Sequence, residues 1–164
     1  PDGEPREVLQ IARHPDPRLV EETQGAVWNF PAGLSGELQI ELRVPTGSYG
    51  FRLCLLDRWF NPTDTVAYES AAYTVEVNAS GHINGTLQTL PRDTWHTLTI
   101  RWTDSCVDQA ALAFDGKLFA LPLKSKSPNG ICYLHVQSLA QQPDLAGVLL
   151  KSVNVNTVPV KNRK

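Results

Sequence analysis

Residues Tyr49–Asp64 read YGFRLCLLDRWFNPTD and contain the clearest strand pattern of the chain. Phe51, Leu53 and Leu55 share one face of an extended segment, and Arg52 begins the opposite face. This alternation is typical of a strand with one face in a hydrophobic core. Because one face of the segment is apolar throughout, we expect a central strand that is half buried in a sheet.

The alternation ends at residues 57–64, where two aromatic rings stand among charged side chains just before a proline. Loops held by a rigid sheet commonly carry function. In a functional interpretation, Trp59 is a stacking platform, and Arg58 and Asn61 make polar contacts with a ligand. In the alternative, Trp59 and Phe60 close the end of the fold and the Asn-Pro step stops the strand. The sequence leaves both interpretations open.

The rest of the chain also has short alternating segments separated by turns, without a sustained helical period. The Pro45–Ser48 turn predicts that strand 37–44 pairs antiparallel with the central strand. Asp115-Gly116 predicts a tight hairpin. The fold prediction is an all-β antiparallel sandwich, a concanavalin A-like jelly roll of about ten to twelve strands. The predicted strands or hairpin segments are residues 7–11, 27–30, 37–44, 49–56, 66–68, 72–77, 82–87, 94–102, 110–114, 117–123, 131–138 and 148–158.

Length and charge limit the organisation and the partners. The 164 residues fit one domain, predicted at 18–160, with an N-terminal arm at 1–17 and a basic tail at 161–164. A net charge of −2 argues against a nucleic-acid partner, and no apolar run has the about 20 residues of a membrane span. Since the chain starts with proline and has no methionine, we expect a mature product or a fragment of a longer polypeptide.

Three cysteines, Cys54, Cys106 and Cys132, lack metal-site spacing. We expect three buried free thiols, with a Cys106–Cys132 disulfide as the alternative. His96 lies on the inward face of its predicted strand, so we expect a hydrogen-bonded core histidine rather than a catalytic base.

Two motifs carry a resemblance to a known family. The segment 93–100, DTWHTLTI, followed by Phe114-Asp115-Gly116-Lys117, resembles a strand pair of concanavalin A-like sandwiches of the laminin-G, pentraxin and glucanase group. Together with DRWFNP at 57–62 and NGICYLH at 129–135, it is similar to sandwich domains attached to bacterial sialidase-type secreted glycosidases. The resemblance implies an exported protein, extracellular or periplasmic, whose partner is a glycan or a neighbouring catalytic domain.

The catalytic residues of the glucanase members do not carry over. Their Glu-x-Asp-x-x-Glu run is absent. Glu37 and Glu41 share one side of a strand, but four strand positions separate them by about 13 Å. Glycoside hydrolysis uses carboxylates about 5 to 9.5 Å apart. The sequence therefore disfavours hydrolysis by this chain alone.

Aromatic, guanidinium and amide side chains are the mixture that sugar recognition needs. If their strands share a sheet, one solvent-facing surface collects Arg52, Trp95, Arg101, Tyr133, His135 and Gln137. Alternatively, these side chains cover the sheet or meet a neighbouring domain. No cofactor is expected except a calcium ion, for which Asp57, Asp64 and Asp144 are candidate ligands.

The function predicted from the sequence is a non-catalytic glycan-binding or accessory module of an exported carbohydrate-processing protein. One alternative is a structural domain that packs against a catalytic domain or partner chain. The other is a small glycoside hydrolase or lyase of the same fold.

Overall fold

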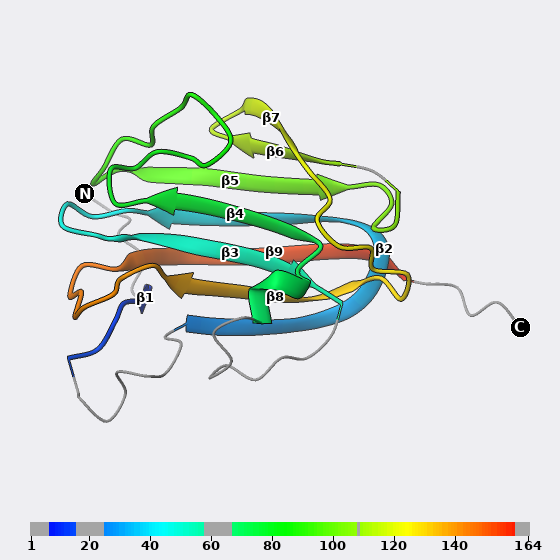
Figure 1. Cartoon of the computed structure of the whole chain (residues 1–164), viewed down its shortest axis with the longest axis horizontal. Coiled ribbons are helices and arrows are strands. Elements are labelled where there is room, and N and C mark those ends of the chain that lie inside the picture. Colours follow the sequence, from blue (N-terminus) through cyan, green and yellow to red (C-terminus); the bar gives the residue numbers. More distant parts are fainter. Residues whose placement is uncertain (1–6, 16–24, 58–66, 108, 160–164) are drawn as a thin grey trace, which may run out of the picture.

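The computed structural model describes residues 7–15, 25–57, 67–107 and 109–159, and it is an all-β fold, as predicted (Figure 1). Its nine strands pair antiparallel throughout, and a short 3-10 helix, η2 (Ala67–Ser70), precedes β4. No helix in these ranges has the length and apolar character to cross a membrane. The strands are β1 (Leu9–Ile11), β2 (Gly25–Arg43), β3 (Gly50–Leu56), β4 (Tyr73–Asn78), β5 (Trp95–Trp102), β6 (Ala110–Phe114), β7 (Lys117–Leu121), β8 (Ile131–Ser138) and β9 (Val148–Pro159).

Strand β2 belongs to both layers of the sandwich. Its first part, residues 25–33, pairs with β8, which is followed by β3 and β4. Its second part, residues 33–43, pairs with β9 on one side and, from Gly36, with β5 on the other, followed by β6 and β7. In Figure 1, β2 curves round at one end of the molecule and so joins the two layers.

The sequence prediction of two strands, 27–30 and 37–44, separated by a turn was wrong, because β2 runs through without a break. The chain bends here because two glycines let backbones approach closely. A Cβ on Gly33 would lie 2.6 Å from Cβ of Thr157, and a Cβ on Gly130 would lie 2.8 Å from the carbonyl carbon of Gly33. The β2 register also shifts between Asn29 and Gly33. Glycine therefore marks a bend inside a strand rather than its end.

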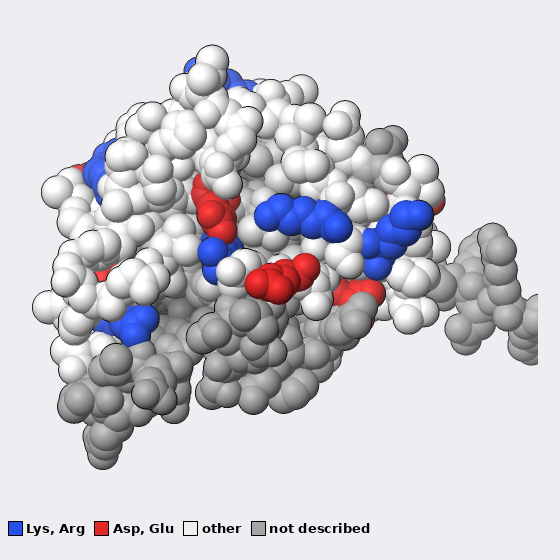
Figure 2. Space-filling model, in the orientation of Figure 1, with Lys and Arg blue, Asp and Glu red and all other residues white. Residues whose placement is uncertain are grey.

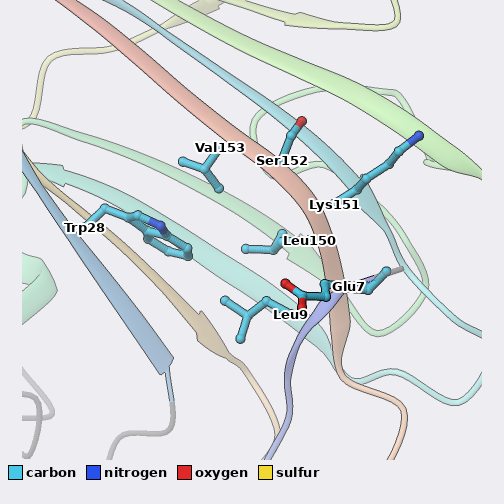
Figure 3. Close-up of a pocket in the computed structure, with 8 residues that line it drawn as sticks. Glu7, Leu9, Trp28, Leu150, Lys151, Ser152 and Val153 are labelled. Atoms are coloured by element: carbon cyan, nitrogen blue, oxygen red, sulfur yellow. The ribbon is translucent and has the colours of Figure 1, made fainter. Parts of the chain in front are cut away.

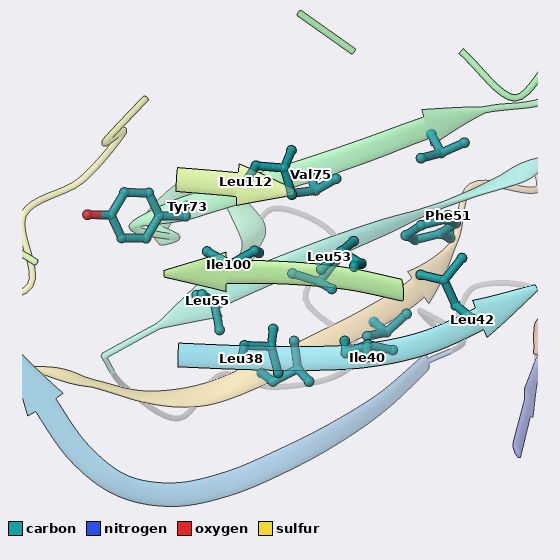
Figure 4. Close-up of a cluster of buried hydrophobic side chains, with 14 of the residues drawn as sticks. Leu38, Ile40, Leu42, Phe51, Leu53, Leu55, Tyr73, Val75, Ile100 and Leu112 are labelled. Atoms are coloured by element: carbon teal, nitrogen blue, oxygen red, sulfur yellow. The ribbon is translucent and has the colours of Figure 1, made fainter. Parts of the chain in front are cut away.

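The core lies between the two layers and includes most side chains predicted from alternation, except that Ile131 rather than Cys132 of β8 belongs to it (Figure 4). Strand β3 lies between β4 and β8, as a central strand should. The expected pairing of 37–44 with the central strand was wrong. The turn at Pro45–Ser48 carries the chain from one layer to the other, so β2 and β3 face each other across the core. The fully buried side chains include Leu38, Ile40 and Leu42 of β2 and Phe51, Leu53 and Leu55 of β3.

The β6–β7 hairpin turns at Asp115 and Gly116, as predicted, with φ values of 49° and 83°. Two other predicted segments are not strands in the described part of the chain. Tyr68 lies in η2, and residues 82–87 contribute only isolated bridges. Because β2 is one strand and these two segments are not strands, the described residues form fewer strands than the sequence predicted.

Candidate functional site

The structure does not bring the predicted binding residues onto one surface. Six of them lie on two outer faces of the sandwich, and three, Arg58, Trp59 and Asn61, lie outside the described residues. Arg52 belongs to β3, and Tyr133, His135 and Gln137 belong to the neighbouring β8. Trp95 and Arg101 belong to β5, which pairs with the other half of β2. The predicted single surface was therefore wrong.

On the β3–β8 face, Arg52 is held by two neighbours. Its Nε lies 2.5 Å from Oε1 of Glu76 on β4. The ring of Tyr68 in η2 lies 3.8 Å from the guanidinium carbon. A guanidinium over an aromatic face is an attractive cation–π contact. Only 16% of the Arg52 side chain is exposed, so this residue is mainly part of the packed structure of the face.

His135 and Gln137 are buried, with exposures of 4% and 8%, although both point away from the core, as predicted. Burial, followed by the positive charge of Arg52, lowers the pKa of His135 to about 4. The prediction that these side chains meet solvent was wrong. A second apolar cluster, of Cys54, Leu56 and Ala71 with Tyr68 and Tyr133 against it, lies on this same face.

The outer face of β5 is more accessible. Trp95 and Arg101 stand near its two ends, with Thr97 and Thr99 between them on the same side. Lys151 of β9 places its Nζ 5.9 Å from the Trp95 ring centroid and 3.9 Å from Oε2 of Glu41. The β2–β9 register shifts at this position and leaves Lys151 as an extra residue, which is how a β-bulge directs a side chain outward.

Arg101 borders a surface hollow of about 350 Å³. Its side chain is 66% exposed, and its Nε donates a hydrogen bond of 2.8 Å to Oε2 of Glu37, which Nη2 also contacts. Nη1 has no hydrogen-bond partner among the described residues. Arg101, Ala111 and Ala120 are cross-strand partners along β5, β6 and β7, whereas the guanidinium of Arg101 turns toward Glu37 on β2, on the other side of β5. The hollow is lined by Arg101, Thr103, Gln109, Ala110, Ala111, Phe119 and Ala120.

Of the residues that line this hollow, only Arg101 was predicted from the sequence as a binding residue. A usable signal was present, because alanines alternate along β6 and recur in β7, which leaves little side-chain volume at Ala111 and Ala120, although Leu118 stands on the same face nearer the turn. On the face of the molecule shown in Figure 2, basic and acidic side chains are interspersed. Recognition on that face would therefore rely on specific contacts rather than on a field of one sign.

A larger groove, of about 440 Å³, lies between β9 and the first part of β2 (Figure 3). The Trp28 ring lies on one side, across from Leu150 and Val153, and Leu9 of β1 is the cross-strand partner of Leu150 (Figure 3). The sequence analysis treated Trp28 only as part of a short strand. The groove is lined by Glu7, Val8, Leu9, Trp28, Leu150, Lys151, Ser152 and Val153.

The predicted calcium ligands do not converge. Asp144 is buried, and its carboxylate accepts hydrogen bonds from the N–H groups of Tyr49, Ala146 and Gly147. Tyr49 precedes β3 and Asp57 follows it, so these carboxylates are separated by the length of β3, about 20 Å. Asp57 and Asp144 cannot share one ion, and Asp64 lies outside the described residues. Nor do the described ranges contain a group of three metal-ligating side chains.

His96 is a buried, hydrogen-bonded histidine, as predicted. Its Nδ1 lies 2.6 Å from Oδ2 of Asp115, and its Nε2 lies 2.7 Å from the carbonyl oxygen of Pro91. The three cysteines are free thiols, in agreement with the favoured interpretation, but only Cys54 is fully buried. Cys132 donates a hydrogen bond of 3.4 Å to the carbonyl oxygen of Asp57.

Comparisons with known proteins identify the fold. No protein-family model and no curated protein matches the chain. Among solved structures, a sialidase is similar over 93% of this chain, with a TM-score of 0.64 and 10% identity. This chain spans 15% of the length of that sialidase chain. The same fold occurs in a toad ovary galectin bound to thio-digalactose (TM-score 0.56, 12% identity, 80% of this chain and 98% of that one). It also occurs in the Caenorhabditis elegans galectin LEC-6 (TM-score 0.55, 11% identity, 94% and 99%). The chain therefore has a lectin-like β-sandwich fold, in line with the resemblance seen in the sequence.

Proposed function

We propose that this chain is a non-catalytic glycan-binding module of an exported carbohydrate-processing protein, and that the outer face of β5 holds the glycan. The observation that carries the proposal is the hollow that Arg101 and Thr103 line together with the small side chains of Ala111 and Ala120. The fold similarity to a galectin bound to thio-digalactose supports this choice of ligand class.

The hollow offers complementary groups for both sides of a sugar. Nη1 of Arg101 and the hydroxyl of Thr103 suit sugar hydroxyls. The methyl groups of Ala111 and Ala120 suit the apolar face of a pyranose ring. Glu37 fixes the guanidinium through Nε and Nη2, so little side-chain entropy remains to be lost when a ligand binds. The volume, about 350 Å³, lies within the range of small-ligand sites.

Trp95 extends this site along β5. Six strand positions separate it from Arg101, a span of about 20 Å. Thr97 and Thr99 lie between them and point to the same side. A glycan of several units could therefore contact the hollow with one end and the Trp95 ring with the other. We expect oligosaccharides to bind more tightly than monosaccharides.

A glycan array with the folded chain tests the proposal. The variant Arg101→Ala should lose binding, whereas Lys126→Ala, which removes an equal charge from an exposed residue that does not line the hollow, should bind like the original protein. The array is run with calcium and with chelator, which tests calcium dependence separately. If the folded chain binds no glycan, or if Arg101→Ala binds unchanged, the proposal is wrong.

A further inference from the structure

Three neighbouring strands present uncharged polar side chains on the outer face of the sheet that contains β5. Gln39 of β2 pairs with Thr99 of β5 on one side and with Asn154 of β9 on the other. Residues directly opposite each other on adjacent strands share a face, with Cβ atoms about 5 Å apart. Gln39 and Asn154 are exposed, and Thr99 is half-buried. Asn156, also exposed, lies two positions along β9 and therefore on the same side. We call Gln39, Thr99, Asn154 and Asn156 the polar platform.

The polar platform holds hydrogen-bonding groups that the fold does not use. Within the part of the chain that the structure describes, none of its four side chains makes a hydrogen bond to another residue. Amides offer two donors and a carbonyl acceptor, and a hydroxyl can both donate and accept. Asparagine is depleted in strands. The strand itself therefore gives no reason for two exposed asparagines in β9, whereas a hydroxyl-rich ligand would use them.

The charges beside the polar platform occur in pairs of opposite sign. Nε of Arg101 donates a hydrogen bond of 2.8 Å to Oε2 of Glu37. Nζ of Lys151 lies 3.9 Å from Oε2 of Glu41. A carboxylate or sulfate on a ligand would therefore meet a protein carboxylate about as closely as it meets a cation, and like charges at an interface are costly. An uncharged hydroxyl meets no such repulsion.

We propose that the glycan is uncharged and that it extends from β5 across β2 to β9, where the polar platform binds its hydroxyls and Gln39 is the central contact. This inference rests on the glycan-binding function proposed above and names its ligand class. The row from Thr99 to Asn154 spans two interstrand distances, about 10 Å in all. The guanidinium of Arg101 turns toward Glu37 on β2, so it lies on the same side of β5 as the platform.

Matched oligosaccharides test the ligand class. The probes are the neutral hexose oligosaccharides of a glycan array, each printed beside a copy whose C6 hydroxyls are oxidised to carboxylates. The neutral member of a pair should bind at least roughly tenfold more tightly than its oxidised copy. Equal binding within the pairs, or a preference for acidic glycans, overturns this inference and leaves the glycan-binding function standing. A folded chain that binds nothing on the array overturns both.

Amide-deleting variants test the polar platform. Gln39→Ala should weaken binding of the neutral array oligosaccharides roughly tenfold, because it removes the central hydrogen-bonding group. Gln141→Ala is the matched control, since it removes the same amide from an exposed residue outside β2, β5 and β9, and it should bind like the original protein. Thermal unfolding of both variants checks that each remains folded. If Gln39→Ala binds unchanged while Arg101→Ala loses binding, the platform is not part of the site and this inference is wrong, although the proposed function stands.

Discussion

The imidazole of His96 lies 2.6 Å from the carboxylate of Asp115, and this contact joins the start of β5 to the tip of the β6–β7 hairpin. The second oxygen of Asp115 accepts a hydrogen bond of 2.8 Å from the N–H of Thr97. Nε2 of His96 lies 2.7 Å from the Pro91 carbonyl oxygen and 3.0 Å from the Thr94 hydroxyl, so both ring nitrogens have partners.

We predict that Asp115→Asn lowers the free energy of unfolding by about 1 kcal/mol at neutral pH, because the amide replaces a charged acceptor. Asparagine tolerates the positive φ of this position, so backbone strain should not contribute. Burial alone would raise the pKa of Asp115, but hydrogen bonds from His96 and Thr97 lower it below its ordinary value. The stabilisation is therefore present above the unfolded-state pKa and is lost as the pH falls through the folded-state pKa.

Urea unfolding of the original protein and the Asp115→Asn variant at neutral pH and below about pH 3 measures this effect. The difference between the two proteins should shrink as the pH falls through the folded-state pKa of Asp115, because the carboxylate is then protonated in the folded state as well. A difference that stays constant across this range would contradict the prediction.

A second prediction concerns His135, whose pKa is lowered to about 4 from 6.5 by burial and by Arg52. The unfolded chain binds a proton in this pH interval and the folded chain does not. Stability should therefore fall as the pH drops from about 6.5 to about 4. The contribution of His135 to this loss is about 3 kcal/mol.

Replacing His135 with Gln removes the titrating group and keeps a polar side chain. The variant should lose less stability than the original protein over the same pH interval, measured by urea unfolding at several pH values. Parallel stability profiles for the two proteins would show that His135 is not the source of the pH dependence.

The third prediction concerns Cys54. Burial raises the pKa of its thiol to about 11, so little reactive thiolate forms near neutrality. Cys54 should therefore resist a maleimide at about pH 8 in the native protein and react once the protein unfolds. Mass spectrometry after brief labelling across a urea series measures this directly, with the half-buried Cys106 as the internal comparison. Labelling of Cys54 at the native rate of Cys106 would contradict the prediction.

The fourth prediction concerns Gly36 in β2. A Cβ at this position would lie 2.5 Å from Cζ2 of the buried Trp102 ring and 2.8 Å from the carbonyl oxygen of Asn156. Gly36→Ala should therefore lower the free energy of unfolding by about 2 to 3 kcal/mol through overpacking. Gly85→Ala is the comparison, because nothing lies within 4 Å and only the φ of 78° is strained. It should cost about 1 kcal/mol. Thermal or urea unfolding measures both losses. The prediction is wrong if Gly36→Ala and Gly85→Ala lower the free energy of unfolding equally.

Alternation in the sequence was enough to predict the strands and the direction of most side chains, because a strand has a period of two wherever one face is buried. It was not enough to predict what covers an outward face. Arg52 and His135 point outward as expected, yet Tyr68 lies over Arg52, and its segment carries no alternation to indicate where it packs. The bend of β2 was missed for a related reason, since Pro31, Gly33 and Gly36 are common in turns as well as in bent strands.

The position of β2 in both layers has a consequence for synthesis of the chain. Its first part pairs with β8 and its second part with β9, whose residues follow about one hundred positions later along the chain. The bend at Gly33 therefore has no partner strand until the last third of the sequence has left the ribosome. Contacts this distant in sequence slow folding. Release of an incomplete chain that lacks β8 and β9 would leave an uncovered core, so completion of the C-terminal strands should decide whether the domain folds or is degraded.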